Sequence, residues 1–437
     1  MTPPRTPTVA IRPLPFPYRG AVTICNDIDG TRPDAFRAMH NLITVELGLE
    51  IGNSFWMYDV GRRDQAFAYL DGRGPARSAH APMIRDLAHA HYLDVLHSYG
   101  NFLEVGEFQR DLAARAIETL VADEIGVKVW VNHGGSPQHQ RLLTSGGALY
   151  HSVGSAFDGL GDRPGTIAYH ADLMTAYGIR YSWDGLCWEI VGQERPAGLV
   201  EAYLSPRGSV RPLSVLRRAT KGALALGRRR TPARAPAGRY GSLHTYSGDN
   251  HLLSVRTLLD GQQILEFKRY GAFSRDRASD LPNLLHPGRL RDLCRLGGYM
   301  LVYNHMGKGA TAERPLPPEA VAALRHLARE QDAGRVLVAT TSRLLEFCRL
   351  SRFLNWTWRE EQGAIEILIA GILDPIRGPE RIARDDLQGV AFRVPAGTRV
   401  SCSLDGAPIP MERAPEPGSS DWDALYLPWK RLTSLRL

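Results

Sequence analysis

The feature that most constrains the fold is a repeated alternation of apolar, β-branched runs with segments of helical periodicity. Strands are predicted at residues 21–25, 54–60, 92–96, 127–131, 179–183, 299–303 and 335–339. Helices are predicted at residues 81–91, 107–123, 171–177, 290–296, 317–331 and 342–350. Such alternation predicts a parallel sheet wound by helices, either closed as a barrel or open.

The pattern divides the chain into three parts. Residues 1–17 are rich in proline and are interpreted as an N-terminal extension, and residues 18–352 carry the helix and strand alternation. From residue 353 to 437 the pattern changes to short apolar runs at 365–369, 390–394, 399–404 and 424–427, separated by Pro, Gly and Asp turns. These runs predict a small C-terminal all-β domain.

Composition excludes several classes of protein. Hydrophobic residues make up 43% of the 437 residues and charged residues 23%, which is typical of a globular chain with a sizeable core. The apolar runs are far shorter than the roughly 20 residues that span a bilayer, and the N-terminus lacks the apolar stretch of a signal peptide. The five cysteines are scattered singly, which argues against a disulfide framework. We therefore expect a cytoplasmic protein.

The net charge of +7 is carried almost entirely by arginine, and the overall composition gives no reason to expect a nucleic-acid partner. Basic residues gather with prolines and glycines at 205–240, which we interpret as an insertion in the barrel region. Two interpretations of this segment stay open. It is either a solvated loop or an anion-binding surface that contacts lipid head groups, such as those of an anionic membrane, or an acidic glycan.

Polar residues suited to a divalent metal follow three of the predicted strands. Asp27 and Asp29 follow the first strand, His97 follows the third and His133 follows the fourth. In parallel α/β folds the active site lies at the carboxyl ends of the strands, so these side chains are expected to converge. The alternative for each residue is a capping or hydrogen-bonded structural role.

Residues 22–30 (VTICNDIDG) resemble the first motif, T-F-D-D-G, of the polysaccharide deacetylase (NodB-homology) family. The resemblance implies a polysaccharide-deacetylase-like (β/α) barrel, seven-stranded and distorted, over residues 18–352. It also implies Asp27 as the general base and Asp29 as a metal ligand.

Residues 97–101 (HSYGN) resemble the second motif of that family, H-[S/T]-x-x-H, with Asn101 at the position of the second metal-binding histidine. His133 would then supply the missing imidazole, and Asn101 would be a weaker oxygen ligand or a substrate contact. One Asp, two His and a water would form the open four-coordinate site of a catalytic zinc ion.

The late segment LVYNH at residues 301–305 resembles the family's Leu-x-His strand end, which implies His305 as the general acid. Asn132, His170, Trp183 and Asp184 lie near further strand ends and are candidate sugar-binding residues. Core packing or capping is the alternative for each of them.

The leading functional hypothesis is a metal-dependent hydrolase that removes an N- or O-acetyl type group from a sugar in bacterial surface polysaccharide metabolism. Its carbohydrate substrate would be lipid-linked or nucleotide-linked, at the inner membrane face. A second hypothesis is a glycoside hydrolase in which Asp27 or Asp29 pairs with Asp184 or Glu189. A third, prompted by Asn101, is a non-catalytic carbohydrate-binding protein with a decayed site.

Overall fold

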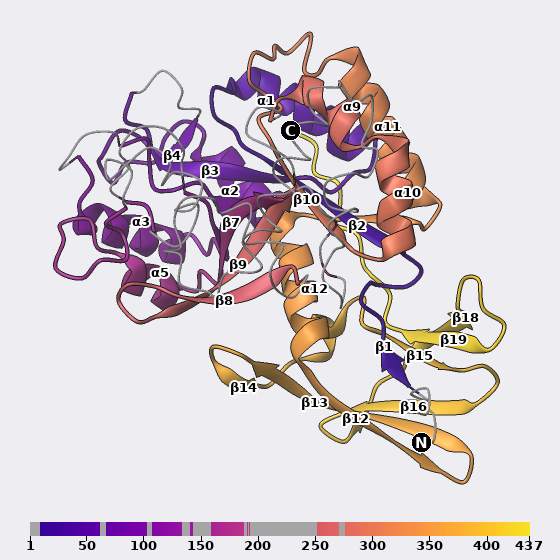
Figure 1. The fold of residues 1–437 in the computed structure, drawn as a ribbon. Coiled ribbons are helices and arrows are strands. Elements are labelled where there is room, and N and C mark those ends of the chain that lie inside the picture. Colours follow the sequence, from indigo (N-terminus) through magenta and orange to yellow (C-terminus); the bar gives the residue numbers. More distant parts are fainter. Residues whose placement is uncertain are drawn as a thin grey trace, which may run out of the picture.

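The structure is a computed structural model that describes residues 9–61, 67–102, 107–132, 140–142, 159–187, 190, 192, 251–270 and 276–437, with the backbone alone for 184–187. In these described ranges seven parallel strands form a closed ring (Figure 1). In ring order they are β2 (Gly20–Asn26), β10 (Tyr299–Asn304), β9 (Gln263–Tyr270), β7 (Tyr181–Cys187), β6 (Val129–Trp130), β5 (Leu93–Leu96) and β3 (Gly52–Tyr58). The prediction of an α/β fold with a barrel is confirmed.

Strand β2 is the point of closure. One of its edges pairs with β10 from Ala21 to Asn26. Its other edge is shared, because β11 (Val336–Val338) pairs with residues Gly20 to Val22 and β3 pairs only at Cys25 and Asn26. The ring therefore closes at the carboxyl end of β2. Asp27 and Asp29 come directly after this end of the strand.

Three more strands extend the ring outward. β4 (Ala68–Leu70) adds to β3, β11 adds to β2, and β8 (Leu253–Thr257) pairs antiparallel with β9. Strands β8 and β9 lie in a region where the sequence pattern predicted no strand. The prediction was therefore wrong about one member of the ring, β9.

Helices follow most of the ring strands, and most of these helices cover the outside of the barrel (Figure 1). They are α1 (Pro33–His40), α2 (Ala81–His89), α3 (Arg110–Ala122), α5 (Ala171–Tyr177), α9 (Leu281–Leu284), α10 (Pro287–Leu296), α11 (Pro318–Asp332) and α12 (Thr341–Phe353), with a π-helix, η1, over Asn41–Glu46. α11 is typical, because Leu324, Leu327 and Ala328 recur at helical spacing and are buried. Burial of each leucine stabilises the fold by about 1.5–3 kcal/mol.

The side chains of β2 alternate between two apolar clusters, as the two-residue period of a strand requires. Val22 and Ile24 pack with the outer helices, whereas Ala21 and Cys25 pack with side chains of the other ring strands and of α12. The first turn of α12 also contacts β5, since the backbone N–H of Ser342 donates to Oδ2 of Asp94 at 2.6 Å.

Beyond α12 the chain forms two sheets that lie apart from the ring (Figure 1). One contains β12 (Leu354–Glu361), β13 (Ala364–Asp374), β14 (Gly378–Glu380), β16 (Arg399–Leu404) and β17 (Ala407–Pro408), and the other β1 (Ala10–Ile11), β15 (Ala391–Pro395), β18 (Glu412–Pro415) and β19 (Trp422–Tyr426). The four apolar runs predicted between residues 353 and 437 overlap β13, β15, β16 and β19. β1 comes from the region interpreted as an N-terminal extension and pairs antiparallel with β15.

After β19 the chain returns to the barrel, where its yellow trace reaches α1 (Figure 1). The side-chain amide of Asn41 donates to the carbonyl oxygen of Leu437 and accepts from its N–H, both at 2.9 Å. Nε2 of His40 lies 2.8 Å from the carbonyl oxygen of Leu435. Both ends of the described chain are therefore held by other parts of the fold.

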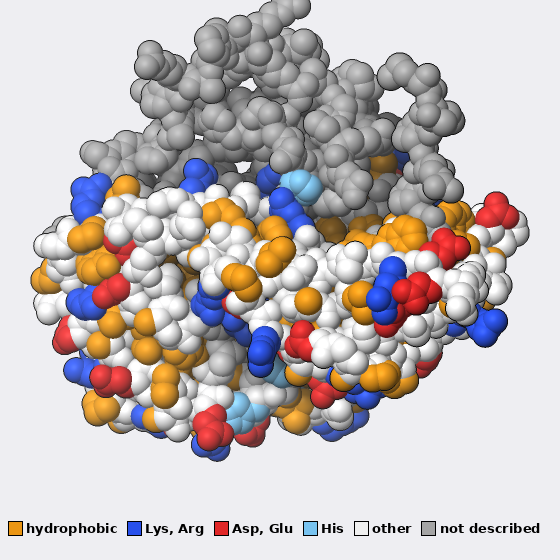
Figure 2. Space-filling model, turned by 90° about the horizontal axis from the view of Figure 1, so that it is seen from below, with side chains coloured by type: hydrophobic (Ala, Val, Ile, Leu, Met, Phe, Trp, Pro, Cys, Tyr) orange, Lys and Arg blue, Asp and Glu red, His pale blue; other side chains and the backbone are white. Residues whose placement is uncertain are grey.

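On the face seen from below, charges of both signs are interspersed with apolar side chains over the described part (Figure 2). The basic segment 205–240 lies outside the described residues. Within the ranges given above, no helix is long and apolar enough to cross a membrane.

Candidate active site

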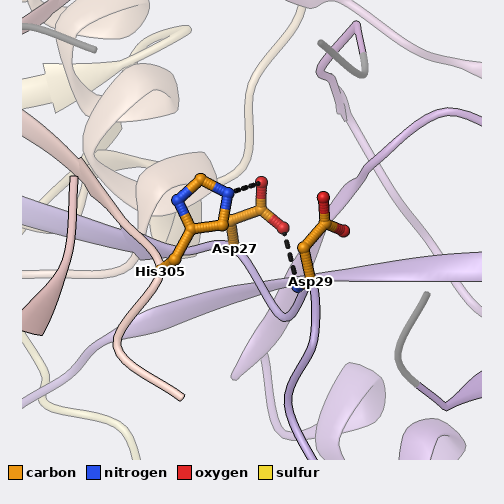
Figure 3. Close-up of side chains that lie close together, drawn as sticks. All are labelled: Asp27, Asp29 and His305. Atoms are coloured by element: carbon orange, nitrogen blue, oxygen red, sulfur yellow. Dashed lines mark hydrogen bonds and ion pairs between the residues drawn. The ribbon is translucent and has the colours of Figure 1, made fainter. Parts of the chain in front are cut away.

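Asp27 and Asp29 occupy a tight turn directly after β2. The N–H of Asp27 donates to the carbonyl oxygen of Asn304 at 2.8 Å, which extends the β2 and β10 pairing by one residue. The N–H of Asp29 then donates to Oδ1 of Asp27 at 3.0 Å. Gly30 has a φ of 65°, a left-handed conformation that glycine adopts at no steric cost, and it turns the chain away. The turn brings the two carboxylates close together (Figure 3).

His97 follows β5 and points at the same two carboxylates. Its Nε2 lies 3.1 Å from Oδ2 of Asp27 and 3.7 Å from Oδ1 of Asp29. The next residue, Ser98, has a φ of 58° and its hydroxyl donates to the carbonyl oxygen of Val131 at 3.2 Å. This left-handed residue turns the chain immediately after the histidine.

His305 follows β10 and also contacts Asp27 (Figure 3). Its Nε2 lies 3.1 Å from Oδ2 of Asp27, and its Nδ1 lies 3.2 Å from Oδ2 of Asp276. The side chain of His305 is 14% exposed, against 1% for Asp27 and for His97. His305 is therefore the member of the cluster that solvent reaches most easily.

The electrostatics of the cluster are dominated by burial and by opposite charges in contact. Burial would raise the pKa of Asp27, but His97 and His305 hold that pKa well below its usual range. Burial would lower the pKa of both imidazoles, yet Asp27 and Asp29 raise the pKa of His97 to about 9. Asp27 and Asp276 likewise raise the pKa of His305 to about 10. The protonated imidazoles of His97 and His305 therefore balance the negative charges of Asp27 and Asp29.

The donor atoms of the cluster suit a divalent cation. One ligand atom from each of Asp27, Asp29 and His305 lies within 4.8 Å of the others, and Nε2 of His97 contacts both aspartates. Carboxylate oxygens and imidazole nitrogens are the ligands of catalytic zinc and of related first-row metals. The residues present therefore fit the metal that the family resemblance implies.

The other predicted site residues are placed as follows. His133 lies outside the described residues, and of Asp184 only the backbone in β7 is described. Asn101, four residues after His97 in the sequence, is buried. The amide of Asn132 bonds to the backbone of Leu142 through both its oxygen and its nitrogen, at 3.2 and 3.0 Å.

His170 and Trp183 contact other side chains. His170 is fully buried, with its ring 5.2 to 5.5 Å from those of Tyr99, Phe108 and Trp130. Trp183 is buried in β7, and the guanidinium carbon of Arg269 lies 3.5 Å from the centre of its ring. Their sugar-binding roles stay predictions.

Sequence reasoning missed four residues that surround the cluster. The indole N–H of Trp56 donates to Oδ1 of Asp29 at 3.1 Å, and the hydroxyl of Tyr303 donates to Oδ2 of Asp27. Asp276 holds His305, and Arg269 stacks on the ring of Tyr303 at 3.9 Å. Tyr303 stood within the quoted strand-end motif, two residues before His305, and was the easiest of the four to find.

Comparisons with known proteins identify no family for this chain. No family model matches the chain, and the search of curated proteins gives no significant match. One solved structure found is that of the Bordetella bronchiseptica enzyme WbmG in complex with NAD and UDP. It has 9% sequence identity and a TM-score of 0.17, over 74% of this chain and 98% of that chain. So low a TM-score carries no argument about fold or function.

Proposed function

We propose that this chain is a metal-dependent hydrolase that removes an N- or O-acetyl type group from a sugar. One observation carries the proposal. Two carboxylates and two imidazoles from three strand ends meet at the carboxyl edge of a closed parallel barrel. This edge is where barrel enzymes bind and turn over substrates.

Asp29 and His97 would hold the ion, together with His133. A divalent ion held there would supply Lewis-acid activation of water and of the acyl oxygen. Asn101 is the alternative third ligand, and the two choices predict different responses to Asn101→His. If His133 is a ligand, the substitution changes zinc affinity little. If Asn101 is the ligand, it tightens zinc binding, because imidazole is a better zinc ligand than an amide oxygen.

Asp27 and His305 would move the protons of the reaction. Asp27 accepts a proton from the water as the water oxygen bonds to the acyl carbon, and His305 gives a proton to the leaving nitrogen or oxygen as its bond to that carbon breaks. Asp276 at Nδ1 of His305 fixes the orientation of the ring. The 3.1 Å contact between Asp27 and His305 gives the proton held by Asp27 a direct route back to the imidazole.

The proposal also includes the type of barrel and the nature of the C-terminal region. Residues 18–352 would form a polysaccharide-deacetylase-type barrel, and residues 353–437 an accessory all-β domain. The substrate would be a lipid-linked or nucleotide-linked sugar of a bacterial surface polysaccharide. Segment 205–240 would contact anionic lipid at the inner membrane face.

Zinc titration of the chelator-treated full chain, combined with acetate release from acetylated oligosaccharides, tests the proposal. We expect about one equivalent of zinc and zinc-dependent acetate release. Asp29→Ala should abolish zinc binding, whereas Asp27→Asn should retain the ion and lose turnover. A wild-type chain that binds no zinc would remove the proposal. Cleavage of glycosidic bonds that survives chelation would replace it with a carboxylate glycosidase.

A further inference from the structure

Trp56 occupies the one ring strand that lies between the two strands that present Asp29 and His97. β3 pairs with β2 on one side and with β5 on the other, and Asp29 follows β2 while His97 follows β5. Trp56 is fully buried in the middle of β3. A side chain at this position can therefore reach both residues at once.

The indole contacts both of them, in two different ways. Its N–H donates to Oδ1 of Asp29 at 3.1 Å, and this is the oxygen that lies 3.7 Å from Nε2 of His97. Its ring centroid lies 4.7 Å from that of His97, with the two planes inclined by 53°. The hydrogen bond fixes the rotamer of the carboxylate, and the ring contact limits rotation of the imidazole.

A packing role alone does not account for this arrangement. A phenylalanine would fill most of the same volume, and the neighbouring Phe55 in β3 is itself buried without any donor. A buried indole N–H needs an acceptor, and here that acceptor is a carboxylate of the candidate metal site. Hydrogen bonds to a charged acceptor are roughly twice as strong as neutral ones, so the contact orients Asp29 firmly.

We propose that Trp56 is a positioning residue that orients Asp29 and His97 as ligands for a divalent cation. This inference rests on the proposed function. Trp56 itself touches neither the ion nor the substrate. It restricts the rotation of the Asp29 and His97 side chains before the cation binds. Less conformational entropy is therefore lost on binding, and the affinity for the cation is higher.

Two substitutions distinguish the contribution of the indole N–H to zinc affinity from the contribution of the ring. Trp56→Phe removes the donor and part of the ring, and replacement of Trp56 by 3-benzothienylalanine removes only the donor, because sulfur takes the place of the N–H. Zinc affinity is measured for each full-length protein by competition with a chromophoric chelator, after urea unfolding has shown that it is folded. We expect both proteins to bind zinc about 10- to 100-fold more weakly than the wild type. The absorption bands of the cobalt-loaded proteins should shift as well.

Trp356→Phe is the matched control. It removes the same atoms from a ring that packs on Phe392 at 4.9 Å, in the sheets beyond the barrel, and should leave zinc affinity within about twofold. Wild-type affinity in the benzothienylalanine protein would overturn the inference, even if Trp56→Phe binds weakly, because the effect would then be one of packing. Failure of the wild type to bind zinc overturns the proposed function itself, which is a different result.

Discussion

Nε2 of His305 lies 3.1 Å from Oδ2 of Asp27, although the two residues follow different strands of the ring. The register of β10 and β2 explains the contact, because Asn304 stands opposite Asn26 at the last pair of the ladder. The residues that follow both strands must therefore emerge side by side. In the proposed reaction this contact joins the proton acceptor to the proton donor.

The first prediction concerns that donor. His305→Gln should lower kcat by about 10²- to 10⁴-fold, because it removes the general acid. Asp276→Asn should lower kcat less, since the imidazole stays and loses only the carboxylate beside Nδ1. Both variants should keep their zinc, measured by elemental analysis. Loss of zinc from His305→Gln would instead make His305 a ligand.

The hydroxyl of Tyr303 leads to a second prediction. It donates to Oδ2 of Asp27, so Tyr303→Phe removes a hydrogen bond to the proposed base. Hydrogen bonds to charged groups contribute about 1.5–3 kcal/mol, which corresponds to roughly a 10- to 100-fold loss in kcat with KM little changed. Steady-state kinetics measure both, and Tyr426→Phe, on β19 beyond the barrel, serves as the control. An unchanged kcat in Tyr303→Phe would show that the contact does not position Asp27.

The sequence predicted the central residues of the site because each follows an apolar run that ends abruptly. Asp27, Asp29, His97 and His305 all stand at such points, and a parallel sheet gathers the carboxyl ends of its strands. Their convergence therefore depends on the fold class and not on the details of packing. The positions of the residues that sequence reasoning missed, such as Trp56 and Arg269, do depend on those details of packing.

Strand β9 was missed because charged residues interrupt its apolar pattern. Glu266, Lys268 and Arg269 lie within eight residues of strand, and two of them are buried. Glu266 forms an ion pair with Arg256 at 3.0 Å, and Arg269 stacks on aromatic rings. A periodicity argument expects charged residues to be exposed to solvent, but here these tertiary contacts stabilise them in a buried strand. Without β9, neither Arg269 nor Asp276 could be assigned to the site.

Strand β1 escaped prediction for a different reason. Two residues are too few for any periodicity, and the pairing partner β15 lies at the far end of the chain. The residue after β1, Arg12, is buried and lies 3.1 Å from Glu416, while its guanidinium also donates to the carbonyl oxygens of Leu14 and Tyr18.

The third prediction follows from these contacts of Arg12. Arg12→Ala should lower the free energy of unfolding by about 3–5 kcal/mol, because it leaves the carboxylate of Glu416 largely buried without its partner. Arg359→Ala is the matched control, since Arg359 forms an exposed cross-strand pair with Glu366 that should contribute about 1 kcal/mol or less. Urea unfolding measures both. Equal losses in the two variants would contradict a special role for the N-terminal segment.

The last prediction concerns the pH dependence of stability and rests on His170. Burial lowers the pKa of this imidazole from its ordinary value of 6.5 to about 4. Its Nδ1 lies 2.8 Å from the carbonyl oxygen of Ala168, and aromatic rings surround it. As the pH falls from 6.5 to about 4, the unfolded chain gains a proton at this residue while the folded chain does not, so stability is lost across that window.

Replacement of His170 by phenylalanine isolates this contribution. His170→Phe keeps an aromatic ring among Tyr99, Phe108 and Trp130 but cannot titrate, and it loses the hydrogen bond to Ala168 at every pH. Between pH 7.5 and pH 4, the wild type should therefore lose about 3 kcal/mol more of its unfolding free energy than the variant, since each pKa unit corresponds to about 1.4 kcal/mol. Urea unfolding at the two pH values measures the difference. If wild type and variant lose stability in parallel, His170 is protonated in the folded state and the aromatic cluster admits a charge.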